Sequence, residues 1–183
     1  FGSHFTKPLY GDFCFSNIPE TIKKLLGAKS SNTLPESILK GLPQQYDKIV
    51  LFYIDAFGWK SMERHLETHP LLRRIEKEGV ISKITSQFPS TTAPHVVSIH
   101  SGCPVGESGI YEWYMYDPKL DSIISPLLFN FAGSEERNTL QNAGLQPGDL
   151  FPHRSLYKEL KTENITSFLS LIHISEPTRL ATI

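Results

Sequence analysis

Residues 48–55 read KIVLFYID, and this stretch indicates the architecture of the chain. Six consecutive apolar residues, 49–54, are β-branched or aromatic at most positions. Such a short uninterrupted run is typical of a central parallel strand that is covered on both faces. A buried helix segment is the alternative, but the run is short for a helix. We therefore predict a strand over residues 48–54.

Helix-like and strand-like segments alternate around this stretch. Apolar spacing together with Gly and Pro signals predicts helices over residues 18–26, 35–40, 60–69, 71–78, 92–100 and 156–160, and strands over residues 80–87 and 165–169. This alternation predicts an α/β fold, a doubly wound and mostly parallel sheet with helices on both faces. No internal repeat or linker divides the chain.

Composition narrows the class of protein. The 183 residues fit one domain, and 18 basic against 19 acidic side chains leave a net charge of −1. This balance argues against a nucleic-acid partner, and no apolar run reaches the length of a membrane span. The two cysteines, Cys14 and Cys103, are expected to be buried thiols, with a disulfide between them as the alternative. We expect a cytoplasmic protein, but a lost signal peptide stays open because the chain begins at Phe1.

Asp55 directly follows the predicted strand. In a doubly wound sheet, ligands bind at the carboxyl ends of the strands, so a carboxylate at this position suits a metal or a phosphate-bound cation. The alternative is that Asp55 caps the helix that begins near Trp59. Asp55 by itself does not decide between these roles.

A second candidate lies in residues 88–95, which read FPSTTAPH between a predicted strand and a predicted helix. A helix N-terminus favours an anion such as a phosphate oxygen. A hydroxyl there becomes a nucleophile when a neighbouring base or metal removes its proton. The alternative is a helix cap formed by Thr91 or Thr92, with Pro94 in the first turn.

Other side chains have simpler interpretations. His65 and His69 are expected on a solvated helix face, and His95 and His100 are expected to make hydrogen bonds rather than bind zinc. The aromatic stretch 111–116 is interpreted either as a wall for a substrate ring or as core or edge-strand packing.

Taken together, these segments resemble the nucleotide pyrophosphatase/phosphodiesterase (type I phosphodiesterase) family of the alkaline phosphatase superfamily. The resemblance rests on residues 55–58 (DAFG), 88–93 (FPSTTA) and 101–110 (SGCPVGESGI). Residues 8–11 (PLYG) and 25–27 (LLG) are also similar to bacterial members.

The resemblance implies a reaction and its cofactors. Thr92 would be the nucleophile and a metal ligand, and Asp55 would bind the same metal. Two divalent ions, with zinc as the favoured metal, would support cleavage of a phosphodiester or pyrophosphate bond in a small phosphate ester or nucleotide. A phosphomonoesterase or phosphotransferase of the same superfamily is an alternative, as is a non-catalytic α/β module in which Asp55 and Thr92 are helix caps.

The sequence departs from the family pattern at two positions, and it lacks the segments that carry the remaining metal ligands. Ala56 replaces the usual Gly, and Ser108 stands where many relatives have His. The family's remaining metal ligands, in Asp-x-x-x-His and Asp-His-Gly segments, have no counterpart here. The resemblance therefore implies a fragment that is inactive alone.

The end of the chain has a separate interpretation. Residues 171–179 (LIHISEPTR) resemble a peptide that results when sequencing-adapter DNA is translated by mistake. We assign residues 1–170 to the N-terminal part of an alkaline-phosphatase-like catalytic domain and residues 171–183 to a non-native tail. A native strand and loop is the alternative for this tail, and the oligomeric state is not indicated.

Overall fold

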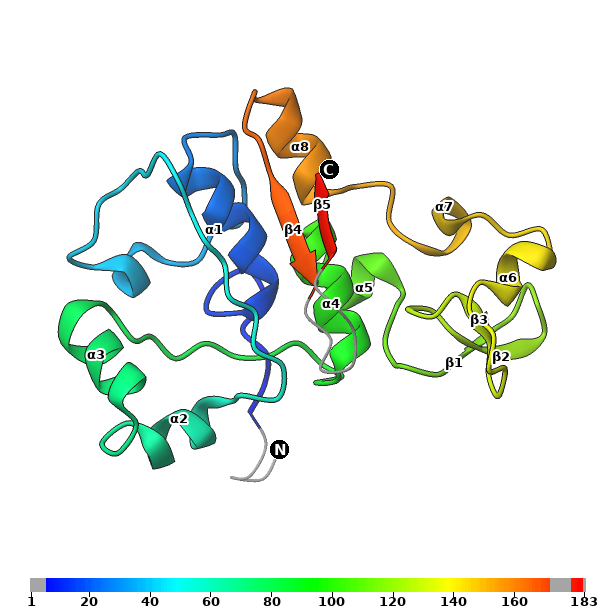
Figure 1. The fold of residues 1–183 in the computed structure, drawn as a ribbon, viewed down its shortest axis with the longest axis horizontal. Helices are drawn as coiled ribbons and strands as arrows, with labels where there is room; N and C mark the ends of the chain where they lie inside the picture. Colours follow the sequence, from blue (N-terminus) through cyan, green and yellow to red (C-terminus); the bar gives the residue numbers. More distant parts are fainter. Residues whose placement is uncertain (1–5, 172–178, 183) are drawn as a thin grey trace.

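A computed structural model describes residues 6–171 and 179–182 (Figure 1). Its elements, in chain order, are η1 (Phe15–Asn17), α1 (Ile18–Leu25), η2 (Glu36–Leu39), α2 (Trp59–His65), α3 (Pro70–Glu78), α4 (Thr92–Ser101), α5 (Val105–Ser108), β1 (Met115–Asp117), β2 (Ser122–Ser125), β3 (Asn130–Phe131), α6 (Thr139–Asn142), α7 (Pro147–Leu150), α8 (Leu156–Thr162), β4 (Phe168–Leu171) and β5 (Arg179–Thr182). No helix in the described ranges is long and apolar enough to cross a membrane.

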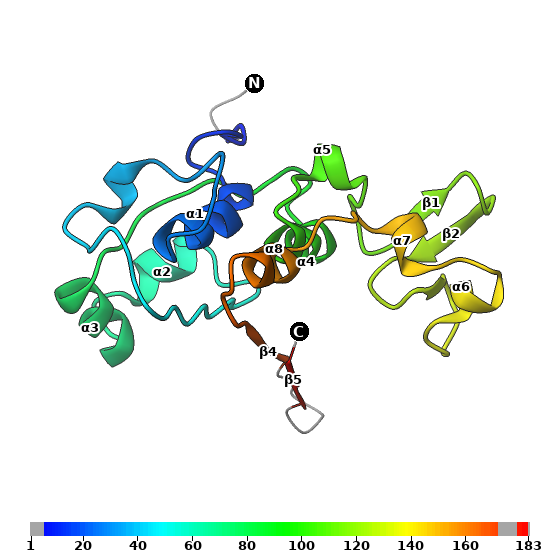
Figure 2. The same cartoon turned by 90° about the horizontal axis from the view of Figure 1, so that it is seen from above.

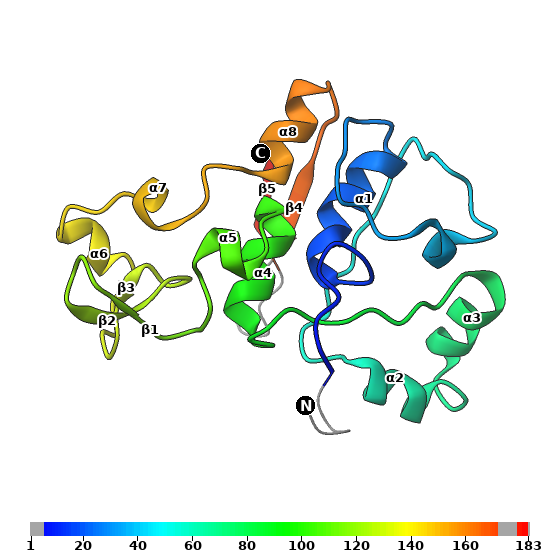
Figure 3. The ribbon, with the colours of Figure 1, turned by 180° about the vertical axis from the view of Figure 1, so that it is seen from behind.

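Three helices occupy the centre of the molecule. Helix α4 packs against α1 and α8, and the three lie together in views from opposite sides (Figures 1 and 3). Ala28 packs with Leu156 and Leu160 in one apolar cluster, while Ala93 and Val97 of α4 form a second cluster with Ile110. The centre therefore holds the N-terminal end of α4, where the predicted nucleophile lies.

A small antiparallel sheet lies at one end of the molecule, beside α6 and α7 (Figure 2). Its strand order is β1-β2-β3, and Met115 pairs with Ile124, which in turn pairs with Phe131. Ile124 and Leu140 are fully buried and form the core of this end together with Phe129.

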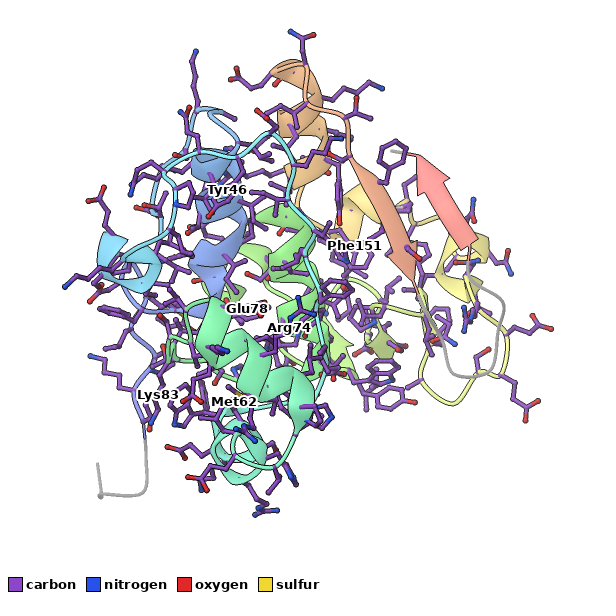
Figure 4. The ribbon with its side chains drawn as sticks, turned by 60° about the vertical axis from the view of Figure 1, so that its left-hand side comes forward. Tyr46, Met62, Arg74, Glu78, Lys83 and Phe151 are labelled. Atoms are coloured by element: carbon purple, nitrogen blue, oxygen red, sulfur yellow. The ribbon has the colours of Figure 1, made fainter. Side chains whose placement is uncertain are left out.

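Helices α2 and α3 lie at the opposite end (Figures 1 and 2), and neither contains a buried residue. The side chains of Arg74 and Glu78, labelled in Figure 4, form an i,i+4 ion pair of 2.9 Å on the surface of α3. Pro70 begins α3, and Gly79 follows its last residue.

The predicted strand over residues 48–54 is not a strand in this structure. Residues 48–54 form neither a helix nor a paired strand, and Val50, Phe52 and Ile54 are 76%, 82% and 64% exposed. A strand exists only where a neighbour accepts and donates its backbone hydrogen bonds, and the described residues place no such neighbour beside this run.

The doubly wound, mostly parallel sheet is likewise not confirmed. Both sheets among the described residues are antiparallel, and the predicted strand over residues 80–87 contributes only an isolated parallel bridge between Thr85 and Cys14. The mixture of helices and strands fits an α/β fold at this coarser level.

The predicted helices are found with small shifts at their ends, and the predicted short helical stretch over residues 35–40 is a 3-10 helix. The predicted strand over residues 165–169 lies at 168–171, where β4 pairs antiparallel with β5. Cys14 and Cys103 are buried and free, as predicted. Residues 172–178 and 183 lie outside the described residues, so the non-native tail stays a prediction.

Candidate active site

Asp55 lies on an exposed turn directly after the apolar run. Its Oδ1 accepts a hydrogen bond of 2.9 Å from the backbone N–H of Ala56. Ala56 has φ +58°, in the left-handed region, and this conformation turns the chain away from the apolar run. Burial raises the pKa of the Tyr53 phenol, and the nearby Asp55 carboxylate raises it further.

Thr92 is the first residue of α4, a helix of ten residues. Its hydroxyl donates a hydrogen bond of 3.1 Å to Oδ2 of Asp55. The two oxygens of Asp55 therefore have separate partners, one on its own turn and the other at the start of α4. The structure thus brings together the two residues that the sequence singles out.

Neither residue caps a helix with its side chain. The N-cap of α2 is Gly58 rather than Asp55, and the N-cap of α4 is Thr91 rather than Thr92. No side-chain cap hydrogen bond forms at either helix. The hydroxyl of Thr91 is buried without a hydrogen-bond partner among the described residues. The capping interpretation of Asp55 and Thr92 therefore has no support in the geometry.

The segment before Thr92, residues 87–91, is held from several sides. The hydroxyl of Tyr10 accepts a hydrogen bond of 3.0 Å from the N–H of Phe88 and lies 3.4 Å from its carbonyl oxygen. Gln87 is 1% exposed, and its Oε1 accepts a hydrogen bond of 2.9 Å from the N–H of Val105. The sequence assigned neither Tyr10 nor Gln87 a role beside Thr92, because no local pattern links them to this segment, although Tyr10 lies in the PLYG stretch of the resemblance.

Aromatic packing connects the two halves of the site. The ring of Phe15 lies edge-on to His95 at 4.8 Å and tilted against Tyr53 at 5.7 Å. His95 belongs to α4, and Tyr53 precedes Asp55 by two residues. Phe15 thus contacts both the helix that carries Thr92 and the segment that carries Asp55.

His65, His69 and His100 lie where the sequence predicts them. His65 and His69 are exposed on and after α2. His100 hydrogen-bonds the hydroxyl of Tyr157 on α8, and burial lowers the pKa of its imidazole. Within residues 6–171 and 179–182, no group of three His, Cys, Asp or Glu side chains is placed to hold a metal ion.

The aromatic stretch over residues 111–116 lies partly in the small sheet. Tyr111, Tyr114 and Tyr116 are 42%, 53% and 51% exposed, so they are not core residues. The hydroxyl of Tyr116 donates a hydrogen bond of 2.7 Å to Asp121 between β1 and β2. A role for this stretch as a substrate wall stays a prediction.

Comparison with known families adds an independent observation. Residues 49–130 match the family model described as type I phosphodiesterase / nucleotide pyrophosphatase. This part of the chain is similar to that family. The comparisons found no match among curated proteins or solved structures. The matched segment contains both Asp55 and Thr92.

Both departures from the family pattern lie within this matched segment. Ala56 adopts φ +58°, a conformation that glycine reaches without steric cost, which explains the glycine of the family pattern. The Ser108 hydroxyl lies 3.4 Å from the carbonyl oxygen of Val105 and 3.3 Å from the backbone nitrogen of Ile110. Ser108 therefore has local backbone partners in and after α5.

Proposed function

We propose that this chain carries the nucleophile segment of a metal-dependent hydrolase that cleaves phosphodiester or pyrophosphate bonds. The observation that carries the proposal is the 3.1 Å hydrogen bond between the Thr92 hydroxyl and the Asp55 carboxylate at the N-terminus of α4. The match of residues 49–130 to a phosphodiesterase family supports the same reaction class.

The reaction we propose begins with the Thr92 hydroxyl. Its oxygen forms a bond to phosphorus while the bond between phosphorus and the leaving oxygen breaks on the opposite side. The leaving oxygen keeps the bonding electron pair and takes a proton from water. The hydroxyl proton passes to Oδ2 of Asp55, its hydrogen-bond acceptor. The oxygen of a water molecule then bonds to phosphorus and the bond from phosphorus to the Thr92 oxygen breaks. The Thr92 oxygen takes back the proton held by Asp55, and a proton of the attacking water passes to solvent. The free N–H groups and the dipole of α4 favour the negative charge of the phosphoryl oxygens at this position.

The family resemblance implies two divalent metal ions, with zinc as the first candidate. The oxygens of Asp55 and Thr92 converge and would hold one side of a single ion. The described residues supply no group of three metal ligands, so they fit only part of such a site. Divalent ions stabilise the charge of the attacking and leaving oxygens in this class of reaction. We propose that residues outside this chain supply the other ligands.

The substrate class follows from the same proposal. We propose a small phosphate ester or a nucleotide, which would present its phosphorus to Thr92. The geometry of Asp55 and Thr92 does not favour the non-catalytic alternative, because neither side chain caps a helix.

The experiment is turnover of a nitrophenyl phosphodiester by the full-length protein with added zinc. We expect Thr92→Ala to lower turnover about 1,000-fold or more, as loss of a nucleophile does in other hydrolases. Thr92→Ser keeps a hydroxyl and should retain part of the activity. EDTA should abolish turnover, and zinc should restore it.

Thr91→Val is the matched control for this experiment. It removes the neighbouring hydroxyl, which is buried and unpaired among the described residues, and it keeps the shape of the side chain. We expect Thr91→Val to keep the wild-type turnover. Full activity in Thr92→Ala, or equal losses in Thr91→Val and Thr92→Ala, would contradict the assignment of the nucleophile.

A further inference from the structure

His95 contacts both ends of the segment that leads into Thr92. It lies on the first turn of α4 and is 8% exposed. The backbone N–H of Gln87 donates a hydrogen bond of 3.1 Å to its Nε2. Its Nδ1 lies 2.8 Å from the carbonyl oxygen of Thr91. One imidazole ring therefore bridges the first and the last residue of the 87–91 segment.

The partners of the ring determine its protonation. A backbone N–H can only donate, so Nε2 must offer a lone pair to Gln87. A carbonyl oxygen can only accept, so Nδ1 must carry the hydrogen that points to Thr91. Both hydrogen bonds exist together only in the neutral Nδ1–H tautomer of His95.

The bridge bears directly on the position of Thr92. Thr92 follows Thr91, so the hydrogen bond from His95 to the Thr91 carbonyl holds the peptide group from which the Thr92 backbone starts. The same ring packs against Phe15, which also contacts Tyr53 ahead of Asp55. His95 therefore contacts Thr91, which precedes Thr92, and Phe15, which packs against the segment that carries Asp55. Thr92 and Asp55 are the two residues joined by the 3.1 Å hydrogen bond.

We propose that His95 is a positioning residue for the Thr92 nucleophile. This role rests on the proposed function of Thr92, whereas the bridge from Gln87 to Thr91 does not. His95 touches neither Thr92 nor Asp55 through a hydrogen bond, and it acts by fixing the approach of the chain to α4. Its loss should lower kcat while the KM changes little, because a displaced nucleophile slows the chemical step more than it weakens binding.

Two substitutions each keep one half of the bridge. In His95→Asn, the side-chain amide nitrogen takes the place of Nδ1 and can donate to the Thr91 carbonyl. In His95→Gln, the side-chain oxygen takes the place of Nε2 and can accept from the Gln87 N–H. His95→Leu fills the buried space and loses both hydrogen bonds.

The matched control is His100→Leu. His100 lies in the same helix, is partly buried and hydrogen-bonds Tyr157 on α8 rather than the 87–91 segment. A merely structural role for His95 would make the kinetic effects of the two Leu variants alike.

The first measurement is the nitrogen NMR spectrum of the wild-type protein labelled at its histidines, which reads the tautomer without any substitution. We expect His95 to be neutral with its hydrogen on Nδ1. A ring protonated on Nε2 would overturn the bridge. Amide hydrogen exchange gives a second readout, and in His95→Leu the Gln87 N–H should exchange about tenfold faster relative to the helix amides of α8. Unchanged exchange at Gln87 would also overturn the bridge.

The second measurement is the kinetics of the full-length protein on the nitrophenyl phosphodiester with zinc. We expect His95→Leu to lower kcat about 100-fold, with the KM changed less than about threefold, and His95→Gln and His95→Asn to recover about tenfold of that loss. His100→Leu should keep the wild-type kcat. Wild-type kcat in His95→Leu, or an equal loss in His100→Leu, would overturn the positioning role.

The two proposals fail in different ways. If Thr92→Ala keeps its turnover, the proposed function is wrong and His95 has no nucleophile to position, although the NMR spectrum still tests the bridge. If Thr92→Ala is inactive and His95→Leu is fully active, the proposed function stands and the positioning role is wrong. Should His95→Leu fail to fold, the Gln and Asn variants carry the same comparison.

Discussion

Thr92 Oγ1 and Asp55 Oδ2 lie 3.1 Å apart although 37 positions separate the two residues in the sequence. A hydrogen bond to a charged carboxylate stabilises a protein more than a neutral one does. The contact is exposed, so solvent weakens it. Its contribution can be measured apart from any catalytic activity.

We predict that Asp55→Ala and Thr92→Val are coupled by about 0.5–1.5 kcal/mol in the free energy of unfolding. A double-mutant cycle in urea measures this coupling. The control cycle pairs Asp55→Ala with Thr91→Val, because Thr91 has no hydrogen bond to Asp55, and its coupling should be near zero. Equal couplings in the two cycles would show that the contact is absent in solution.

Ala56 offers a test of backbone strain at the turn beside Asp55. A left-handed conformation costs a residue with a Cβ about 1–2 kcal/mol, while glycine loses about 0.5–1 kcal/mol more chain entropy on folding. Because Ala56 has φ +58°, we expect Ala56→Gly to raise the free energy of unfolding by up to about 1 kcal/mol. Thermal and urea unfolding measure this change.

Ala143→Gly is the control for that substitution. Ala143 is also exposed, but its φ is −83°, which an alanine adopts without strain. Glycine there should lower the free energy of unfolding by about 0.5–1 kcal/mol. The two substitutions should therefore have opposite signs, and a loss of stability in both would refute strain at Ala56.

An ionic cluster joins α1 to α8, although the two helices are far apart in the sequence. Its members are Glu20, Lys23, Arg154 and Glu159. The Glu20 side chain is 4% exposed and pairs with Lys23 at 3.1 Å and with Arg154. Its Oε2 also accepts a hydrogen bond of 2.6 Å from the N–H of Ser31. Glu20→Gln removes the buried carboxylate that both cations share, while Glu159 still pairs with each of them. We therefore expect a loss of about 1.5–3 kcal/mol in unfolding free energy, the range for hydrogen bonds to charged groups.

The control for Glu20 is Glu36→Gln. Glu36 pairs at 3.1 Å with Lys24, which lies in α1 like Glu20, but the Glu36 side chain is 76% exposed. Exposed pairs contribute at most about 1 kcal/mol. Chemical denaturation should therefore separate the two variants clearly, and similar losses would mean that the Glu20 cluster is as hydrated as a surface pair.

Glu159 makes the same cluster sensitive to acid. Its hydrogen bond to Arg154 lowers the pKa of the Glu159 carboxyl, burial partly opposes this, and Lys23 lowers it further. The folded state thus binds a proton less readily than the unfolded state. The stability from Glu159 is present above the unfolded pKa of about 4.3 and is lost as the pH falls through the lower folded pKa.

We therefore expect Glu159→Gln to be less stable than the wild type at pH 7 and to lose less stability between about pH 5 and pH 3. Urea titrations across this pH range measure both quantities. The control is Glu163→Gln, at an exposed position directly after α8. This substitution should leave the dependence of stability on pH as it is in the wild type. A slope in Glu159→Gln equal to that of the wild type would contradict a lowered pKa.

Helices were predicted well because their signals are local. The apolar residues of α1 recur at helical spacing, Pro70 begins α3, and Gly102, with φ +74°, follows the last residue of α4. Each of these signals acts within a few residues, since helix hydrogen bonds join residues four positions apart. The chain can therefore be interpreted segment by segment at these places.

Strands were predicted poorly for the opposite reason. The apolar run over residues 49–54 has the composition of a buried strand, but whether it becomes one depends on neighbours that the run itself does not encode. In the described structure its side chains are largely exposed. The sheet that does form, β1-β2-β3, joins strands that follow one another closely along the chain.

From the sequence alone, one can identify the helices, three phosphodiesterase-like motifs and two candidate residues, Asp55 and Thr92, because each of these depends on a short run of residues. Only the tertiary structure decided that their oxygens meet, that neither side chain caps a helix, and that His95 and Phe15 support them. These contacts join residues 8 to 80 positions apart, and their formation depends on how the whole chain packs, which no local pattern records.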